Sequence, residues 1–279
     1  MSKNSKWFSP ALGRPLVWSD THNRIIALFA LAAFPLAFFW KYFTEPSGLW
    51  DIIWVSAGAP VTVFITWAIG REGDPARPWS ALIAAFVSLI SWGLFNNPDF
   101  MLLLVALMSL RVINRSTGKR ATLPESAFIL FLTAWLTWSG SVYAGAIVGL
   151  AFWLDARLPD RRLSHYLFAL MALITGVAAS LVTRDISVYP KELQLYFIAV
   201  VTLLSIPTIL YYLKERVIAD NGMEVPRSRV LAAVGLLWLF LSCNAFMSPN
   251  IGLNDTYPFL MVFICMGILN TVSGRSMKN

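Results

Sequence analysis

Long apolar runs with almost no charged residue constrain this chain more than any other feature of its sequence. Seven such runs occupy 25–43, 51–70, 79–95, 164–183, 193–213, 230–247 and 258–273. A helix needs about 20 consecutive apolar residues to cross a hydrocarbon core about 30 Å thick. The residues come in blocks rather than at the spacing of amphipathic surface helices, and they do not alternate as in strands of a membrane barrel. The sequence therefore predicts an all-α, polytopic transmembrane helix bundle.

The middle of the chain leaves two ways to count the membrane segments. A shorter apolar run spans 100–113, and the stretch 127–154 is either one long helix or two short ones broken at Trp138–Val142. Cytoplasmic loops of membrane proteins collect Lys and Arg. If the N-terminus is cytoplasmic and the stretch is broken, 19 of the 22 basic residues are cytoplasmic; an unbroken helix leaves 12 inside and 10 outside. The bias favours about ten segments instead of nine, with both termini in the cytoplasm.

Three consecutive segments are short under this interpretation, namely 100–113, 127–138 and 142–154. At about 1.5 Å per residue each is shorter than the hydrocarbon core, so we expect short or re-entrant helices here. Residues 1–24 are a predicted cytoplasmic segment without a signal-peptide core, 25–273 a single transmembrane domain, and 274–279 a short cytoplasmic tail. We expect the chain to be integral to a membrane, the bacterial cytoplasmic (inner) membrane.

Residues that affect helix packing lie inside or at the ends of these segments. Small residues at four-residue spacing, which allow close helix approach, are Ser141, Gly145 and Gly149. Prolines that should kink their helices are Pro35, Pro60 and Pro207. Aromatic residues near the predicted boundaries, as in interfacial belts, include Trp79, Tyr211 and Tyr212.

The predicted cytoplasmic loops contain acidic as well as basic residues, and this mixture is the main candidate for a binding site. Arginine binds phosphate through two parallel hydrogen bonds, and a nearby carboxylate can bind a metal ion or act as a base. The alternative is charge that orients the chain and is compensated by salt bridges. The candidate residues for substrate binding are Arg71, Glu72, Asp74, Arg77, Arg111, Arg115, Asp155, Arg157, Asp160 and Arg161.

Within the apolar segments we find polar but uncharged candidates, of which Thr133, Thr137 and Asn244 stand out. The alternative role for such residues is hydrogen bonding between helices. His22 and His165 are interpreted as interfacial histidines, and no metal-binding spacing of His, Cys or Asp occurs. We therefore expect no metal, no cofactor and no catalytic residue that the sequence can name.

Two stretches resemble each other at helix starts. Pro75, Arg77 and Ser80 have the same spacing as Pro159, Arg161 and Ser164. A parallel internal repeat, as in some transporters, would place both stretches on the same side of the membrane. Pro, Arg and Ser are also favoured by local physics where a helix begins. The second explanation is preferred, and it leaves only Asp155 and Asp160 of the later stretch unexplained.

Three functions fit these observations. The first is a permease-like carrier for a small neutral or amphipathic solute or a lipid, with transport as its activity. The second is a membrane enzyme acting on a lipid or isoprenoid phosphate at the cytoplasmic face, and the third is a non-catalytic membrane subunit or assembly factor. The net charge of +7 is scattered through short loops, so it indicates topology and no nucleic-acid partner. The expected partners are the lipid bilayer and possible further membrane subunits.

Overall fold

The computed structural model describes residues 12–13, 16, 18–116, 119–183, 192–218, 222, 224–247 and 252–276, with side chains described up to Val272 in the last range. The predicted tail at 274–279 and most of the segment before Trp18 lie outside the described side chains. Nearly all described residues belong to helices. The helices are α1 (Thr21–Thr44), α2 (Leu49–Gly73), α3 (Pro78–Phe95), α4 (Phe100–Asn114), α5 (Leu123–Trp138), α6 (Tyr143–Arg157), α7 (His165–Thr183), α8 (Glu192–Tyr212), α9 (Arg227–Met247) and α10 (Leu253–Ser276).

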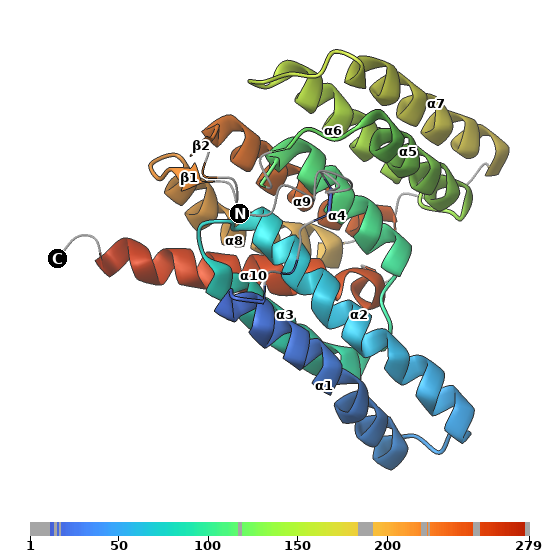
Figure 1. Ribbon diagram of the computed structural model, residues 1–279. Coiled ribbons are helices and arrows are strands. Elements are labelled where there is room, and N and C mark those ends of the chain that lie inside the picture. The colour runs from blue at the N-terminus through green and yellow to red at the C-terminus, as the bar shows by residue number, and fades with distance from the viewer. Residues whose placement is uncertain are drawn as a thin grey trace, which may run out of the picture.

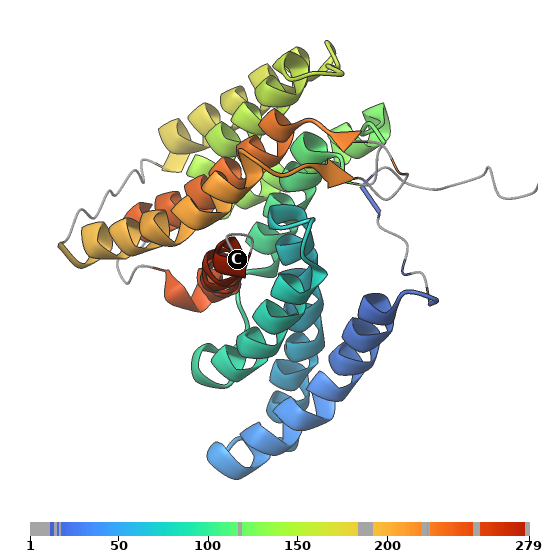
Figure 2. The same ribbon diagram turned by 90° about the vertical axis from the view of Figure 1, so that its left-hand side faces the viewer.

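The helices include two sequence-adjacent groups, with the other helices packed between and beside them (Figure 1). One group is the sequence-adjacent set α1, α2 and α3, and another is α5, α6 and α7. Between them lie α4 and α9, each of which contacts both groups, while α10 packs against α3 and α8. The view in Figure 2 shows α1 at the periphery, away from α5–α7. A buried apolar core extends from α1 to α10 through these contacts.

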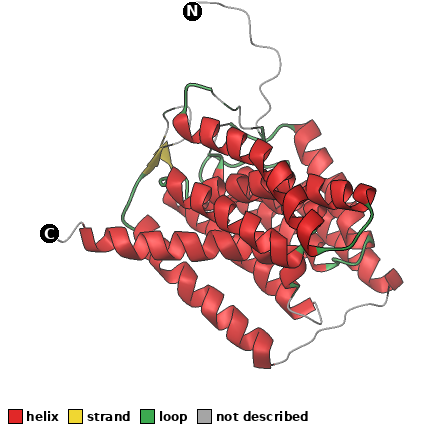
Figure 3. Ribbon diagram, turned by 90° about the horizontal axis from the view of Figure 1, so that it is seen from below, coloured by secondary structure: helices red, strands yellow, loops and turns green. Residues whose placement is uncertain are grey.

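A short antiparallel strand pair, β1 (Val217–Ile218) and β2 (Glu224–Val225), joins α8 to α9. It lies at one edge of the helical bundle (Figure 3). Tyr212 packs with the apolar residues of this hairpin and with Val230 in a small separate cluster. The hairpin thus fixes the end of α8 against the start of α9.

The predicted break inside 127–154 is confirmed. The chain leaves α5 at Trp138 and begins α6 at Tyr143, and Gly140 in the connection has φ +115, a conformation that glycine tolerates best. The start of α5 has the reciprocal hydrogen bonds of a capping box between Thr122 and Glu125. At 15, 16 and 15 residues, α4, α5 and α6 are the short helices that the sequence predicts.

Seven of the described helices are long and apolar enough to cross a membrane by length and composition. They are α1, α2, α3, α7, α8, α9 and α10. The helical, apolar bundle indicates a membrane protein. The number of segments that cross the bilayer and the side on which the termini lie stay predictions.

Several helices extend further than the apolar runs that predict them. The charged residues Arg71, Glu72, Asp155 and Arg157 were expected in loops, but they lie in the last turns of α2 and α6, and Arg111 lies in the last turn of α4 within the predicted run 100–113. For Glu72 and Asp155 this correction has a physical cause, since a charged side chain that finds a partner inside the protein does not force the helix to end at the membrane surface.

Candidate functional site

The mixed-charge residues gather at one end of the bundle, which we call the charged end. It consists of residues 71–77, 111–116 and 155–164, the ends of α2, α4 and α6 with the segments that follow them. Ion pairs and hydrogen bonds connect these segments to one another and to the first turn of α9. The side chains form three clusters, named here after Glu72, Asp155 and Asp74.

The Glu72 cluster joins α2 to the end of α4. Glu72 has no exposed surface, and its carboxylate accepts hydrogen bonds from Arg111 Nε at 3.2 Å and Ser116 Oγ at 2.6 Å. The amide of Asn114 donates to the Glu72 carbonyl at 2.8 Å, although its Oδ1 has no partner. Arg111 also donates to the Leu12 carbonyl and so secures the N-terminal segment. One buried carboxylate therefore orders three parts of the chain.

The Asp155 cluster joins α4, α6, α7 and α9. Asp155 has no exposed surface, and Arg115 donates to both of its carboxylate oxygens, with Nη2 at 2.7 and 2.9 Å. Arg229 Nη1 lies 2.8 Å from the same carboxylate, and His165 Nδ1 lies 2.8 Å from its Oδ2. His165 is accordingly buried, with its Nε2 3.1 Å from the hydroxyl of Ser126. Two arginines and a histidine thus surround one carboxylate.

The remaining donors of both arginines are also used. Arg229 donates to the carbonyls of Pro159 at 2.7 Å and Ile113 at 2.8 Å, and Arg115 donates to Asp160 at 2.6 Å. Arg115 and Asp160 both have left-handed backbones, with φ of 52° and 64°, which is uncommon for residues other than glycine. The hydrogen bonds between these residues offset that conformational cost. The cluster is a connector between helices, with little capacity left for a ligand.

The Asp74 cluster differs because a guanidinium donor and a carboxylate acceptor in it are both without a hydrogen-bond partner. Asp74 ends α2, has no exposed surface, and accepts a short hydrogen bond from the Tyr212 hydroxyl at the end of α8. Its second oxygen, Oδ2, is buried without a hydrogen-bond partner. Arg77 lies over the ring of Tyr211, with its Cζ 3.9 Å from the ring centroid, and its Nη1 is also buried without a partner. Of the three clusters, this one has both an unpaired donor and an unpaired acceptor.

Burial raises the pKa of Asp74, and the hydrogen bond from Tyr212, the nearby hydroxyl of Ser80 and the charges of Arg77 and Arg71 oppose this rise only partly. A folded-state pKa above the unfolded value means that stability is greatest at low pH and falls as the pH rises through the folded pKa. We therefore expect Asp74→Asn, which still accepts from Tyr212, to melt at a higher temperature than the wild type near pH 7. The gain should disappear as the pH approaches 3.8, the ordinary value for this group.

Melting curves of the detergent-solubilised protein between about pH 4 and pH 8 check this pH dependence. Asp51→Asn, at an exposed carboxylate in the first turn of α2, is the matched control. A gain for Asp74→Asn that stays the same at every pH would contradict the assignment to the buried charge.

The other predicted charged candidates lie outside the three clusters. Arg157 is exposed and stacks on Trp153, with its Cζ 4.6 Å from the ring centroid. Arg161 is exposed, and Arg71 donates to the Pro75 carbonyl at 3.5 Å. The two resembling stretches therefore differ in use, because Arg77 is stacked on another helix whereas its counterpart Arg161 faces outward.

Of the three polar candidates in apolar segments, two form hydrogen bonds within their own helix. Thr133 and Thr137 are buried, and each hydroxyl donates to a carbonyl of its own helix, those of Ile129 and Ala134. Asn244 lies in the last turn of α9, and its Nδ2 is buried without a partner. The two threonines therefore offer no free hydroxyl to a solute.

Several members of the clusters were not predicted from the sequence as binding residues. They are His165, Asn114, Ser116, Arg229, Tyr211 and Tyr212. Their partners are far away in sequence, as for Tyr212 and Asp74, which are 138 residues apart. For Arg229 the sequence contained one indication of a partner. A positive charge in the first turn of a helix is unfavourable next to the helix dipole, so a carboxylate from another segment could have been predicted beside Arg229.

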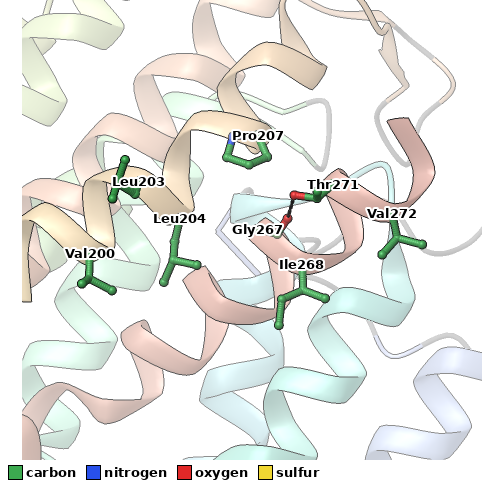
Figure 4. Close-up of a pocket in the computed structure, with 8 residues that line it drawn as sticks. All are labelled: Val200, Leu203, Leu204, Pro207, Gly267, Ile268, Thr271 and Val272. Atoms are coloured by element: carbon green, nitrogen blue, oxygen red, sulfur yellow. Dashed lines mark hydrogen bonds between the residues drawn. The ribbon is translucent and has the colours of Figure 1, made fainter. Parts of the chain in front are cut away.

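An apolar groove of about 420 Å³ lies between α8 and α10 (Figure 4). Its lining residues are Val200, Leu203, Leu204, Pro207, Gly267, Ile268, Thr271 and Val272. The one hydroxyl among them, that of Thr271, donates to the Gly267 carbonyl at 2.8 Å. Gly267 brings the helices close together, because a Cβ there would lie 2.7 Å from the Leu204 carbonyl oxygen. The groove therefore presents an almost purely hydrocarbon surface.

Comparisons of the chain with protein-family models, with curated proteins and with solved structures found no match. No relative therefore supplies a function for the groove or the clusters. Their residues and geometry are the basis on which a function can be inferred.

Proposed function

We propose that this chain is a multi-pass membrane protein of the bacterial inner membrane that acts as a permease-like carrier for an amphipathic molecule, with a membrane lipid as its substrate. The observation that carries the proposal is the apolar groove between α8 and α10. Both helices are apolar and long enough to span a bilayer, so the groove lies within a predicted membrane segment. An acyl chain matches its hydrocarbon lining. Pro207 in the wall of the groove leaves one carbonyl of α8 without its usual bond, as in the kinked helices of many transporters.

The charged end gives less support to the enzyme alternative. A catalytic site there would bring Asp74, Asp155 and Arg161 around one open pocket. Instead, Asp155 is surrounded by Arg115, Arg229 and His165, and Asp74 shares no hydrogen-bond partner with it among the described residues. Among these residues there is also no group of three or more His, Cys, Asp or Glu side chains that could bind a metal ion. The clusters therefore fit better as connectors that fix the helices around a binding groove.

Translocation of a fluorescent phospholipid across proteoliposomes tests the proposed function. We expect vesicles containing the wild-type protein to expose the labelled lipid of the inner leaflet to an external quencher faster than protein-free vesicles. Leu203 is 65% exposed at the mouth of the groove, so Leu203→Trp should fill the groove and slow translocation toward the protein-free rate.

Leu170→Trp is the matched control, because Leu170 is 54% exposed on α7, away from the groove. This variant should translocate lipid at the wild-type rate. Wild-type vesicles that show no more translocation than protein-free vesicles, with the protein folded and inserted, would exclude a lipid-carrier function.

A further inference from the structure

The α8 wall of the groove continues toward the charged end of the bundle. Pro207, which lines the groove, and Tyr211 are four residues apart and therefore lie on the same face of α8. Arg77 lies over the Tyr211 ring. We propose that this end of the groove binds the phosphate of a phospholipid headgroup and that Arg77 contacts the phosphate. The inference rests on the proposed function, since the acyl chains would occupy the same groove.

Arg77 has the chemistry and the free capacity that a phosphate site requires. Its guanidinium is oriented by stacking on Tyr211, with 3.9 Å between Cζ and the ring centroid. None of the described carboxylates forms a salt bridge with Arg77, and its Nη1 is buried without a hydrogen-bond partner. A planar guanidinium can donate two parallel hydrogen bonds to a phosphate. The stacked arginine, whose Nη1 has no hydrogen-bond partner, is thus prepared for an anionic acceptor.

The two adjacent tyrosines explain why Asp74 and Arg77 form no salt bridge, although the two charges attract each other. Tyr212 donates its hydroxyl to Asp74, the acidic residue nearest to Arg77 in sequence, and also accepts from the Ala76 backbone at 3.4 Å. Asp74 is therefore positioned by Tyr212, while Tyr211 positions the arginine. Oδ2 of Asp74 is also without a partner, so the unsatisfied polar atoms of this loop include an acceptor that suits an amine or hydroxyl of a headgroup.

The start of α3 adds to the attraction for an anion at the same place. Arg77 is the N-cap residue of α3, the helix begins with Pro78, and no side chain caps its first turn. The dipole of a helix N-terminus favours negative charge, although Pro78 has no amide hydrogen and the Ser80 amide already donates to the Arg77 carbonyl at 3.1 Å. Trp79 is 57% exposed in that turn, as expected of a tryptophan at headgroup depth. A phosphate at Arg77 would therefore lie at the depth where lipid headgroups lie.

Binding measurements with three probes test the headgroup site on the full chain in an uncharged detergent. The probes are dihexanoyl phosphatidylglycerol, dihexanoylglycerol without the phosphate, and inorganic phosphate, each titrated by calorimetry. We expect the phospholipid to bind the wild type more tightly than dihexanoylglycerol does. Arg77→Gln should weaken phospholipid binding by about tenfold or more, because it removes a charged hydrogen bond, and should leave dihexanoylglycerol binding unchanged.

Arg161→Gln is the matched control, since Arg161 is an exposed arginine at the corresponding position of the resembling stretch. It should bind the phospholipid like the wild type. Arg77→Lys keeps the charge but lacks the planar guanidinium group, so it should lose less phospholipid affinity than Arg77→Gln. It replaces Arg77→Gln in the assay if that variant unfolds at too low a temperature to be measured. Unchanged phospholipid affinity in both Arg77 variants overturns the proposal.

Two outcomes distinguish a lipid headgroup site from a site for soluble phosphate, and distinguish the headgroup site from the proposed carrier function. Inorganic phosphate that binds as tightly as the phospholipid, with Leu203→Trp having no effect, would identify a site for soluble anions and overturn the lipid assignment. Failure of lipid translocation, together with an affinity for phospholipid that depends on Arg77, would remove the carrier function and leave the headgroup site in place.

Discussion

Replacing Asp155 by Ala should destabilise the protein by about 3–5 kcal/mol, the loss typical when one partner of a buried ion pair is removed. Asp155 is fully buried, and its carboxylate is the shared acceptor of Arg115 and Arg229. Alanine would leave two guanidinium groups in the interior without that anion. Both arginines reach it from different helices, so the loss should loosen α4, α6 and α9 together. Melting temperature and denaturant unfolding in detergent measure the effect.

Asp160→Asn is the control for this prediction, because asparagine also tolerates the left-handed backbone of residue 160. Asp160 also accepts from Arg115, at 2.6 Å, but it is 53% exposed, so its ion pair is screened by water and should contribute about 1 kcal/mol or less. A double variant in which Asp155 and Arg229 are both replaced by leucine should recover part of the loss, because it removes a buried charge along with the carboxylate. Equal destabilisation by Asp155→Ala and Asp160→Asn would show that burial does not govern this cluster.

The positions of the long helices along the chain were largely predictable, because a bilayer requires apolar segments of a certain length. Apolar length located the long helices, and the distribution of Lys and Arg favoured the break between α5 and α6 that the structure contains. The same rules placed the ends too early wherever a charge is buried, as at Glu72 and Asp155. A hydropathy pattern ends a predicted membrane helix at each charged residue, whereas the helix in the folded protein continues past a charged residue that is paired inside the protein.

The partners of the charged residues were not predictable from local patterns. Asp155 and Asp160 stood out as acidic residues that the start of a helix does not explain, and both contact Arg115. Nothing in the sequence, however, joins Asp74 to Tyr212 or Arg77 to Tyr211, because these contacts depend on how α8 packs against the loop before α3. Long-range packing therefore decides which charges form salt bridges within the protein.

The crossing of α6 and α7 should be sensitive to a single added methyl group. A Cβ at Gly145 would lie 2.7 Å from the carbonyl oxygen of Ala172 and 2.8 Å from the backbone of Gly176. Both neighbours are backbone atoms, so no side chain can move aside and the two helices must separate. We expect Gly145→Ala to destabilise the protein by about 1–3 kcal/mol, the usual cost of overpacking, as measured by a fall in melting temperature.

Gly235→Ala should change the stability in the opposite direction from Gly145→Ala. Comparing the two variants therefore tests whether α6 and α7 approach each other closely. Gly235 lies within α9, and a Cβ there meets no heavy atom within 4 Å. Since alanine is the better helix former by about 1 kcal/mol, this variant should be slightly more stable than the wild type. The spacing of Ser141, Gly145 and Gly149 predicted close approach, and the structure identifies α7 as the neighbour. If Gly145→Ala melts as high as Gly235→Ala, α6 and α7 do not pack as closely as their backbones indicate.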